Sequence, residues 1–209
     1  MVQISDTWQL PPDRLDLTGA DVHIWAMSLA RCRLGPVVFE DILSKDEFER
    51  AERFVFEKDR VRFIAARGGL RLILGRYLGR DPGQLVFEYS ERGKPHLKGT
   101  PENLKFNVSH SENLALYAMV HNREVGVDVE YVGRKVGERN RIAKRFFCRA
   151  EYEVFLQVPD DQKQLAFLNC WTRKEAFIKA LGEGLYYPLD AFEVTLTPGE
   201  DAQLVHIHG

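Results

Sequence analysis

The chain has 209 residues, of which 44% are hydrophobic, so it is long enough to bury a substantial core as one large domain or two small halves. A formal net charge of -2 excludes a global attraction to nucleic acid, so any anionic ligand must meet a local cluster of basic side chains. The three cysteines lack zinc or redox-pair spacing and no run of 18 apolar residues occurs, so we expect a cytoplasmic protein that binds neither nucleic acid nor membrane.

The first half of the chain is predicted to contain strands and two helices. Ser44 to Glu47 has the form of a capping box, and Gly79 is a typical C-cap after a helix whose apolar residues recur at helical spacing. In chain order we expect a strand at 22–29, helices at 44–54 and 59–78, a turn at 81–83, a strand at 85–89 and a tight exposed turn at 91–95.

A polar stretch without periodicity, at 98–103, separates the second half, and we take the two units as 1–102 and 103–209. The elements expected beyond it are strands at 106–109, 114–120 and 125–131, a charged loop at 134–140, helices at 141–147, 150–157 and 161–181, and a strand at 192–196. Each half therefore runs strand, helices, strand. This order predicts an α+β fold of two pseudo-symmetric α/β halves with a ligand cleft between them.

Two acidic motifs in the second half are candidates for a functional site. Asp128 and Glu130 alternate with valines, so strand geometry points both carboxylates to one face. In the helix that follows, Trp171, Glu175 and Lys179 recur every fourth residue and lie on one stripe. If the strand and the helix meet, three carboxylates converge, and such a set favours a hard divalent cation such as Mg2+.

Each acidic motif also has a simpler interpretation. Asp128 and Glu130 fit the solvated face of a half-buried strand. Glu175 and Lys179 fit an i,i+4 surface pair that contributes about 0.3–0.5 kcal/mol. Apolar residues surround this helix on several sides, however, and they imply that it is mostly buried; buried charge is costly unless it is paired or metal-bound.

Two further segments could meet an anionic ligand. Lys94 lies in a turn shaped by Gly and Pro, and Ser109 and His110 end a strand side by side, where both can hydrogen-bond a phosphate. His110 also fits a core histidine whose ring is satisfied by backbone groups. The sequence contains no Walker A loop, no Gly-x-Gly-x-x-Gly and no zinc signature, and Ser109 lacks the Gly-x-Ser-x-Gly elbow of a hydrolase.

Four segments, in this order and spacing, resemble the 4'-phosphopantetheinyl transferase superfamily and look like its Sfp-type branch, in which one chain contains two related halves. They are Arg-Gly-Lys-Pro at 92–95, Phe-Asn-Val-Ser-His-Ser at 106–111, Gly-Val-Asp-Val-Glu at 126–130 and Trp-x-x-Lys-Glu-Ala-x-x-Lys-Ala-x-Gly at 171–182. The resemblance covers the chain from Arg50 to Leu196. Beyond Leu196 the sequence departs from the family, whose members often continue with further strands.

The resemblance implies that the phosphopantetheine arm of coenzyme A is transferred to a serine of an apo acyl or peptidyl carrier protein domain, with release of 3',5'-ADP. It implies a monomeric enzyme of the holo-[acyl-carrier-protein] synthase type, in which Asp128, Glu130 and Glu175 hold Mg2+. Its second half would carry the metal site and catalysis, and its first half would contact the nucleotide and dock the carrier through arginines. By similarity, the residues that bind coenzyme A are Arg50, Arg62, Lys94, Pro95, Ser109, His110 and Lys179.

The carrier serine must lose a proton when it attacks the phosphoryl group, and Glu175 is our choice of base, with Asp128 as the competitor. Lys179 and Lys94 would stabilise the developing charge electrostatically. Two other classes remain as alternatives: a catalytically silent module that binds coenzyme A or a carrier domain, and a Mg2+-dependent phosphohydrolase. The intact set of three carboxylates argues against the silent module, which has no need for all of them.

Overall fold

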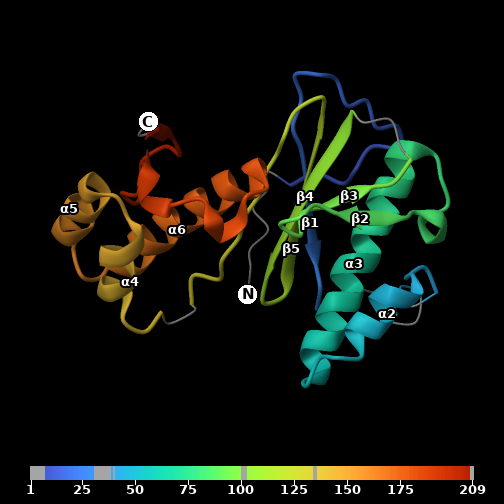
Figure 1. The fold of residues 1–209 in the computed structure, drawn as a ribbon, viewed down its shortest axis with the longest axis horizontal. Coiled ribbons are helices and arrows are strands. Elements are labelled where there is room, and N and C mark those ends of the chain that lie inside the picture. The colour runs from blue at the N-terminus through green and yellow to red at the C-terminus, as the bar shows by residue number, and fades with distance from the viewer. Residues whose placement is uncertain (1–7, 31–38, 40, 100–102, 134–135, 208–209) are drawn as a thin grey trace.

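The computed structural model describes residues 8–30, 39, 41–99, 103–133 and 136–207, and it arranges them in two lobes that lie side by side (Figure 1). The elements up to residue 121 form one lobe, and those from residue 139 onward form the other. This arrangement confirms the α+β class with two halves. The predicted linker at 98–103 and loop at 134–140 lie partly outside the described residues. Within the described ranges no helix is long and apolar enough to cross a membrane.

The N-terminal lobe is built on a three-stranded antiparallel sheet with the order β1-β5-β4. Its elements are β1 (His23–Ser28), α2 (Lys45–Ala51), α3 (Glu57–Leu78), β2 (Phe87–Tyr89), β3 (Pro95–Leu97), β4 (Leu104–Ser111) and β5 (Leu114–His121). The long helix α3 packs Leu70 and Leu74 into one core with Phe106 and Tyr117 of the sheet. Gly79 ends α3 with a φ of 60°, as predicted, because the left-handed conformation costs glycine no steric strain.

A buried carboxylate joins α2 to α3. The predicted capping box is present, with the Ser44 amide donating to Glu47, although α2 ends at Ala51 and not at Phe54. Glu47 is 2% exposed and also accepts hydrogen bonds from Arg67 and Arg71 of α3. Arg71 donates in addition to the carbonyl oxygens that precede β2. One ion cluster therefore fixes α2, α3 and the start of the β2–β3 hairpin relative to one another.

The C-terminal lobe is a helical cluster capped by a small hairpin. It comprises α4 (Arg139–Phe146), α5 (Arg149–Gln157), α6 (Lys163–Leu181), β6 (Phe192–Val194) and β7 (Leu204–Ile207). Phe147, Phe155 and Phe167 form its core together with Phe192. The helices and β6 agree with the sequence-based expectations within about two residues, whereas β7 was not predicted.

The acidic segment, residues 125–131, differs from the strand that the alternation predicts. It is extended and runs past β4, but its amides bond to side chains in place of a partner backbone: Val127 N donates to Asn107, Val129 N to Ser109 and Tyr131 N to Ser111. The alternation is therefore real, although no backbone ladder forms. Figure 1 shows the segment passing between the sheet and the C-terminal end of α6.

Gly126 explains how the acidic segment can approach α6 so closely. A Cβ atom at residue 126 would overlap the carbonyl oxygen of Ala176 and the amide nitrogen of Ala180. The segment is thus held between the face of β4 that carries Asn107 and the backbone of α6. The boundary at residue 102 stays a prediction; pairing of β1 with β5 joins strands from either side of it.

Candidate active site

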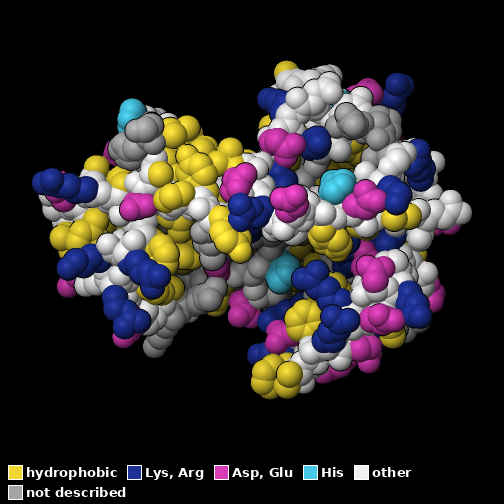
Figure 2. Space-filling view, in the orientation of Figure 1, with side chains coloured by type: hydrophobic (Ala, Val, Ile, Leu, Met, Phe, Trp, Pro, Cys, Tyr) yellow, Lys and Arg dark blue, Asp and Glu magenta, His cyan; other side chains and the backbone are white. Residues whose placement is uncertain are grey.

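One pocket of about 420 Å³ brings together the acidic motifs and the polar end of β4. Its walls come from both lobes, at the place where the space-filling surface is notched between them (Figure 2). The polar lining residues are Ser109, His110, Asp128, Glu130, Glu175 and Lys179. Six of the ten predicted site residues therefore share a single pocket.

Lys179 links the acidic segment to β4. Its ammonium group lies 2.5 Å from Asp128 Oδ1 and 3.1 Å from Ser109 Oγ, and it reaches the carbonyl oxygen of Val127 at 3.4 Å. Ser109 itself donates to Asp128 Oδ1 at 2.8 Å. The Asp128 side chain is only 8% exposed, so this is a partly desolvated ion pair and not a surface contact. The interpretation of Glu175 and Lys179 as a surface pair is not needed, since Lys179 pairs with Asp128.

The second oxygen of Asp128 is buried and has no hydrogen-bond partner among the described residues. A buried carboxylate oxygen without a partner is costly, and a bound cation would satisfy it. Carboxylate oxygens are also the donors that Mg2+ prefers. By donor chemistry, the pocket therefore fits the predicted ion. Across the described ranges, however, no three His, Cys, Asp or Glu side chains lie in an arrangement that could already hold a metal.

Glu175 faces the acidic segment from α6. Burial raises the pKa of Glu175, the charge of Asp128 raises it further, and the charge of Glu130 adds to this, while Lys179 acts in the opposite direction. The carboxylate therefore holds a proton more readily than an ordinary glutamate. Glu130 accepts a hydrogen bond of 3.1 Å from Ser111. Asp128 and Glu130 both line the pocket, so they are more than the solvated face of a strand.

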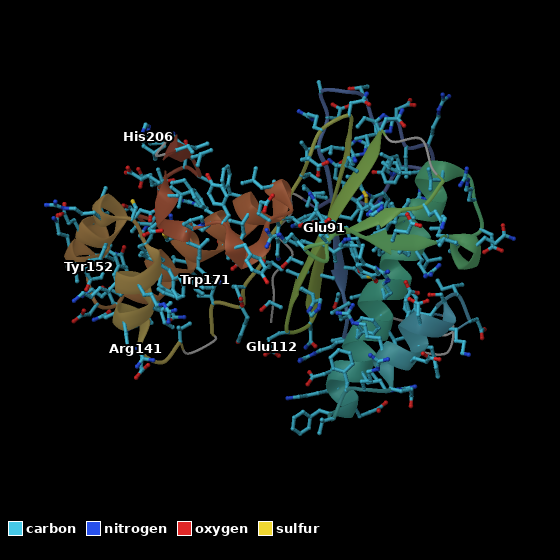
Figure 3. The ribbon with its side chains drawn as sticks, viewed as in Figure 1. Glu91, Glu112, Arg141, Tyr152, Trp171 and His206 are labelled. Atoms are coloured by element: carbon cyan, nitrogen blue, oxygen red, sulfur yellow. The ribbon has the colours of Figure 1, made fainter. Side chains whose placement is uncertain are left out.

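His110, near the C-terminal end of β4, lines the same pocket. The residue is exposed overall, but the pocket walls crowd its ring, and this desolvation together with the charges of Lys179 and Arg62 lowers the pKa of His110. At neutral pH the imidazole is therefore neutral and can both donate and accept a hydrogen bond. Arg62 reaches across from α3 and pairs with Glu112, which Figure 3 labels at the tip of the β4–β5 hairpin.

Lys94 and Pro95 do not line this pocket. They border a second one of about 570 Å³ beside the C-terminal end of α6. Lys94 donates to the carbonyl oxygen of Ala180 at 2.8 Å and to Glu124 at 2.6 Å, so its ammonium group is already held by the helix end. Arg50 lies on α2 with its guanidinium group 5.4 Å from the centre of the Phe63 ring.

Two features of the site region were missed by sequence reasoning. Val136, Ile142 and Trp171 form an apolar part of the lining of the same pocket (Figure 3 labels Trp171 on α6). Of these residues, only Trp171 was indicated by the sequence, through its helical spacing. Lys174 lies beside Glu175 in the sequence but is fully buried in the C-terminal lobe, where it pairs with Glu151 at 2.8 Å. Helical spacing places Lys179, and not Lys174, on the stripe of Trp171 and Glu175, but the sequence gives no signal that Lys174 is buried against Glu151.

Comparison with known proteins agrees with this geometry. Residues 124–208 match the family model of the 4'-phosphopantetheinyl transferase superfamily, and residues 37–122 match that of the 4'-phosphopantetheinyl transferase N-terminal domain. The chain is 44% identical to the 4'-phosphopantetheinyl transferase HetI of Nostoc sp. over 203 residues, which is 96% of this chain and 85% of that protein. It is 33% identical to Sfp of Bacillus subtilis over 158 residues, or 76% of this chain and 68% of that protein.

A human relative is also named as a phosphopantetheinyl transferase. The human L-aminoadipate-semialdehyde dehydrogenase-phosphopantetheinyl transferase is 32% identical over 165 residues, which cover 75% of this chain and 53% of that protein. The two lobes, the acid-lined pocket and these matches together define the class. The chain belongs to the 4'-phosphopantetheinyl transferase superfamily.

Proposed function

We propose that the chain transfers the 4'-phosphopantetheine group of coenzyme A to a serine of an apo acyl or peptidyl carrier protein domain and releases 3',5'-ADP. This makes it an enzyme of the holo-[acyl-carrier-protein] synthase type. The observation that carries the proposal is the contact of Lys179 with Asp128 and Ser109, in one pocket with Glu130 and Glu175. A cation beside clustered acids is suited to bind a diphosphate together with its divalent ion.

Asp128, Glu130 and Glu175 would hold Mg2+ in this pocket, as the unpartnered oxygen of Asp128 supports. When bound, the ion would neutralise charge on the diphosphate oxygens. Lys179 can turn from Asp128 toward a phosphoryl oxygen, because its side chain is flexible and 29% exposed. Ser109 and the neutral His110 would donate to the phosphates nearer the nucleotide.

The remaining coenzyme A contacts are proposed for the N-terminal lobe. Arg62 lies close enough to influence His110, so it suits a phosphate of the nucleotide end. Arg50, Lys94 and Pro95 stay candidates by similarity to the family. For Lys94 the proposal requires the ammonium group to exchange its contact with Glu124 for one with the ligand.

In the transfer step, the oxygen of the carrier serine forms a bond to the β-phosphorus of coenzyme A, and the bond from that phosphorus to 3',5'-ADP breaks. The serine proton must pass to a base. Glu175 is favoured, because burial and the neighbouring acids raise its pKa. Asp128, the competitor, has one oxygen already bonded to Ser109 and Lys179.

Two surfaces are candidates for carrier docking. The first-half surface at 45–62 has six basic and six acidic residues, and several of these pair, as Arg60 does with Glu52. The stretch 139–149, at α4, has five basic residues and no acid, although Arg141 pairs with Glu138 and Arg149 with Glu153, just outside it. Figure 2 shows basic side chains gathered over this part of the C-terminal lobe, and Figure 3 places Arg141 at its outer tip. An acidic carrier helix is attracted by net charge, so α4 is the better match.

A panel experiment tests the proposed function. The purified chain is incubated with coenzyme A, Mg2+ and several apo carrier domains, and the carriers are weighed intact. Transfer to at least one carrier supports the proposal. Tight coenzyme A binding without transfer would favour the silent module, and steady coenzyme A cleavage without a carrier would favour the phosphohydrolase. We propose further that the enzyme acts as a cytoplasmic monomer, which the molar mass in solution can check.

A further inference from the structure

We propose that Asn107 and Ser111 of β4 are positioning residues, which set the register of residues 127–131 and thereby aim Asp128 and Glu130 into the pocket. The inference deepens the proposed function and rests on it for the role of the two acids. Neither residue was among the expected site residues, and neither side chain lines the pocket.

The geometry is a ladder made by side chains. Residues 107, 109 and 111 lie on one face of β4, and they accept from the amides of residues 127, 129 and 131 at 2.9, 3.3 and 3.0 Å. Both sets are spaced by two residues, so the two extended segments run parallel, and each β4 side chain meets its own amide. In an ordinary sheet the backbone carbonyls of the neighbouring strand would do this.

The ladder also contacts the acids themselves. The Ser109 hydroxyl donates to Asp128 and accepts from the amide of Val129, and the Ser111 hydroxyl donates to Glu130 and accepts from the amide of Tyr131. A hydroxyl has one hydrogen to donate and lone pairs to accept with, so both bonds can exist together. Each serine therefore recognises an acid and the next amide at the same time, which a segment shifted by one residue would not offer.

The contacts between the segment and α6, on its other side, cannot set this register. There it faces the backbone of α6 at Ala176, across Gly126, and the amides and carbonyls inside a helix are already paired with one another. Lys179 does contact the segment, but through a flexible side chain that also has to serve the ligand. The fixed contacts are those from β4. Asn107 anchors the start of the ladder and is 6% exposed, and Ser111 anchors its end.

The test compares Ser111→Ala and Asn107→Ala with Ser111→Thr, which keeps the hydroxyl. Amide hydrogen exchange is followed at residues 127, 129 and 131 in the protein without ligands, with the β5 amides as an internal reference for global unfolding. Loss of one hydrogen bond to the ladder should raise exchange at these amides by roughly tenfold while the β5 amides stay protected. We expect kcat to fall more than the KM for coenzyme A rises, and Ser111→Thr to restore both exchange and kcat.

Thr195→Val is the matched control. The Thr195 hydroxyl also accepts a backbone amide, that of Gln203, but it does so in the hairpin of the C-terminal lobe. Its removal should leave exchange at 127–131 and kcat unchanged. Unchanged exchange at residue 131 in Ser111→Ala, or no rescue by Ser111→Thr, would overturn the inference. The two Ser111 variants are sufficient for this test even if Asn107→Ala fails to fold. Absence of transfer by the unaltered protein would refute the proposed function. The exchange rates at residues 127, 129 and 131 would still test whether the β4 side chains hold the segment.

Discussion

In the Lys179–Asp128 contact, the ammonium group of Lys179 pairs with the carboxylate that we expect to bind Mg2+. The contact is 2.5 Å long, and its aspartate keeps one buried oxygen without a partner among the described residues. Unpaired buried oxygens are rare in proteins because they cost free energy, so their presence at a pocket suggests a role in binding. This geometry supports the proposal that Asp128 and Lys179 bind a ligand.

We expect Glu175→Gln and Asp128→Asn each to lower Mg2+-dependent turnover by at least about 10²-fold, because each removes a carboxylate that is proposed to hold Mg2+ and, in the case of Glu175, to take the serine proton. The thermal midpoint should stay close to that of the unaltered protein. Glu153→Gln removes a carboxylate that pairs with exposed Arg149 on α5 and should leave turnover unchanged. Near-normal turnover in Glu175→Gln or Asp128→Asn would contradict the assignment of these acids.

The buried carboxylate of Glu47 leads to a prediction about how stability depends on pH. Burial raises the pKa of Glu47, but the hydrogen bond from Arg71 and the charge of Arg67 outweigh burial and hold the pKa below its ordinary value. A lowered pKa in the folded state contributes stability that is present above the unfolded pKa of about 4.3 and is lost as pH falls through the folded value. The unaltered protein should therefore lose stability on acidification below about pH 5 through this group.

The variant Glu47→Gln lacks this titration and leaves two arginines without their acid. We expect it to be less stable at pH 7 by about 3–5 kcal/mol, and to lose less of its remaining stability between pH 5 and 3. Urea unfolding at a series of pH values measures both quantities. Parallel pH profiles for the two proteins would show that the Glu47 cluster does not act as described.

Among the elements, the acidic segment shows where sequence reasoning succeeds and where it stops. The period-2 pattern correctly predicted an extended segment that presents Asp128 and Glu130 together, since alternation follows from backbone geometry alone. It could not reveal that side chains of β4 replace a backbone partner, because that depends on which elements meet. The same limit applies to Lys174 and Lys179, whose different surroundings are set by tertiary packing.

Gly126→Ala tests how tightly the acidic segment and α6 are packed. The added methyl group would overlap the helix backbone at Ala176 and Ala180, and overpacking of this kind typically costs about 1–3 kcal/mol. We expect a lower thermal midpoint and reduced turnover, since Glu175 and Asp128 lie on the two elements that would be pushed apart. Gly137→Ala is the control, because a Cβ atom there has open space. Equal stability and activity of the two variants would show that residue 126 is not packed tightly against the backbone of α6.

Over the whole molecule, charge is distributed unevenly. The chain has a formal net charge of -2, yet the stretch at 139–149 contains five basic residues without an acid. Such a local field steers a partner of opposite charge and acts mainly on association. The two-lobe arrangement and the α+β class followed from the order of elements in the sequence, but only the structure places α4 next to the apolar wall of the pocket.

The charge of α4 leads to a prediction about the carrier domain. The double change Lys144→Glu and Arg145→Glu should raise the KM for an acidic carrier by about tenfold or more, and most strongly at low salt, while the KM for coenzyme A stays unchanged. The matched variant Arg53→Glu with Lys58→Glu reverses two charges on the first-half surface. If this second variant raises the carrier KM and the first does not, docking lies on the first half.

The central claim is that the acids and Lys179 of one pocket transfer phosphopantetheine to a carrier serine. The most direct measurement is the intact mass of an apo carrier domain after incubation with coenzyme A, Mg2+ and the enzyme, beside a parallel reaction with Glu175→Gln. We predict that the unaltered enzyme adds one phosphopantetheine group to the serine and that the variant adds almost none. A carrier panel that gains no mass with a folded, coenzyme A-binding enzyme, or gains it equally with the variant, would contradict the claim.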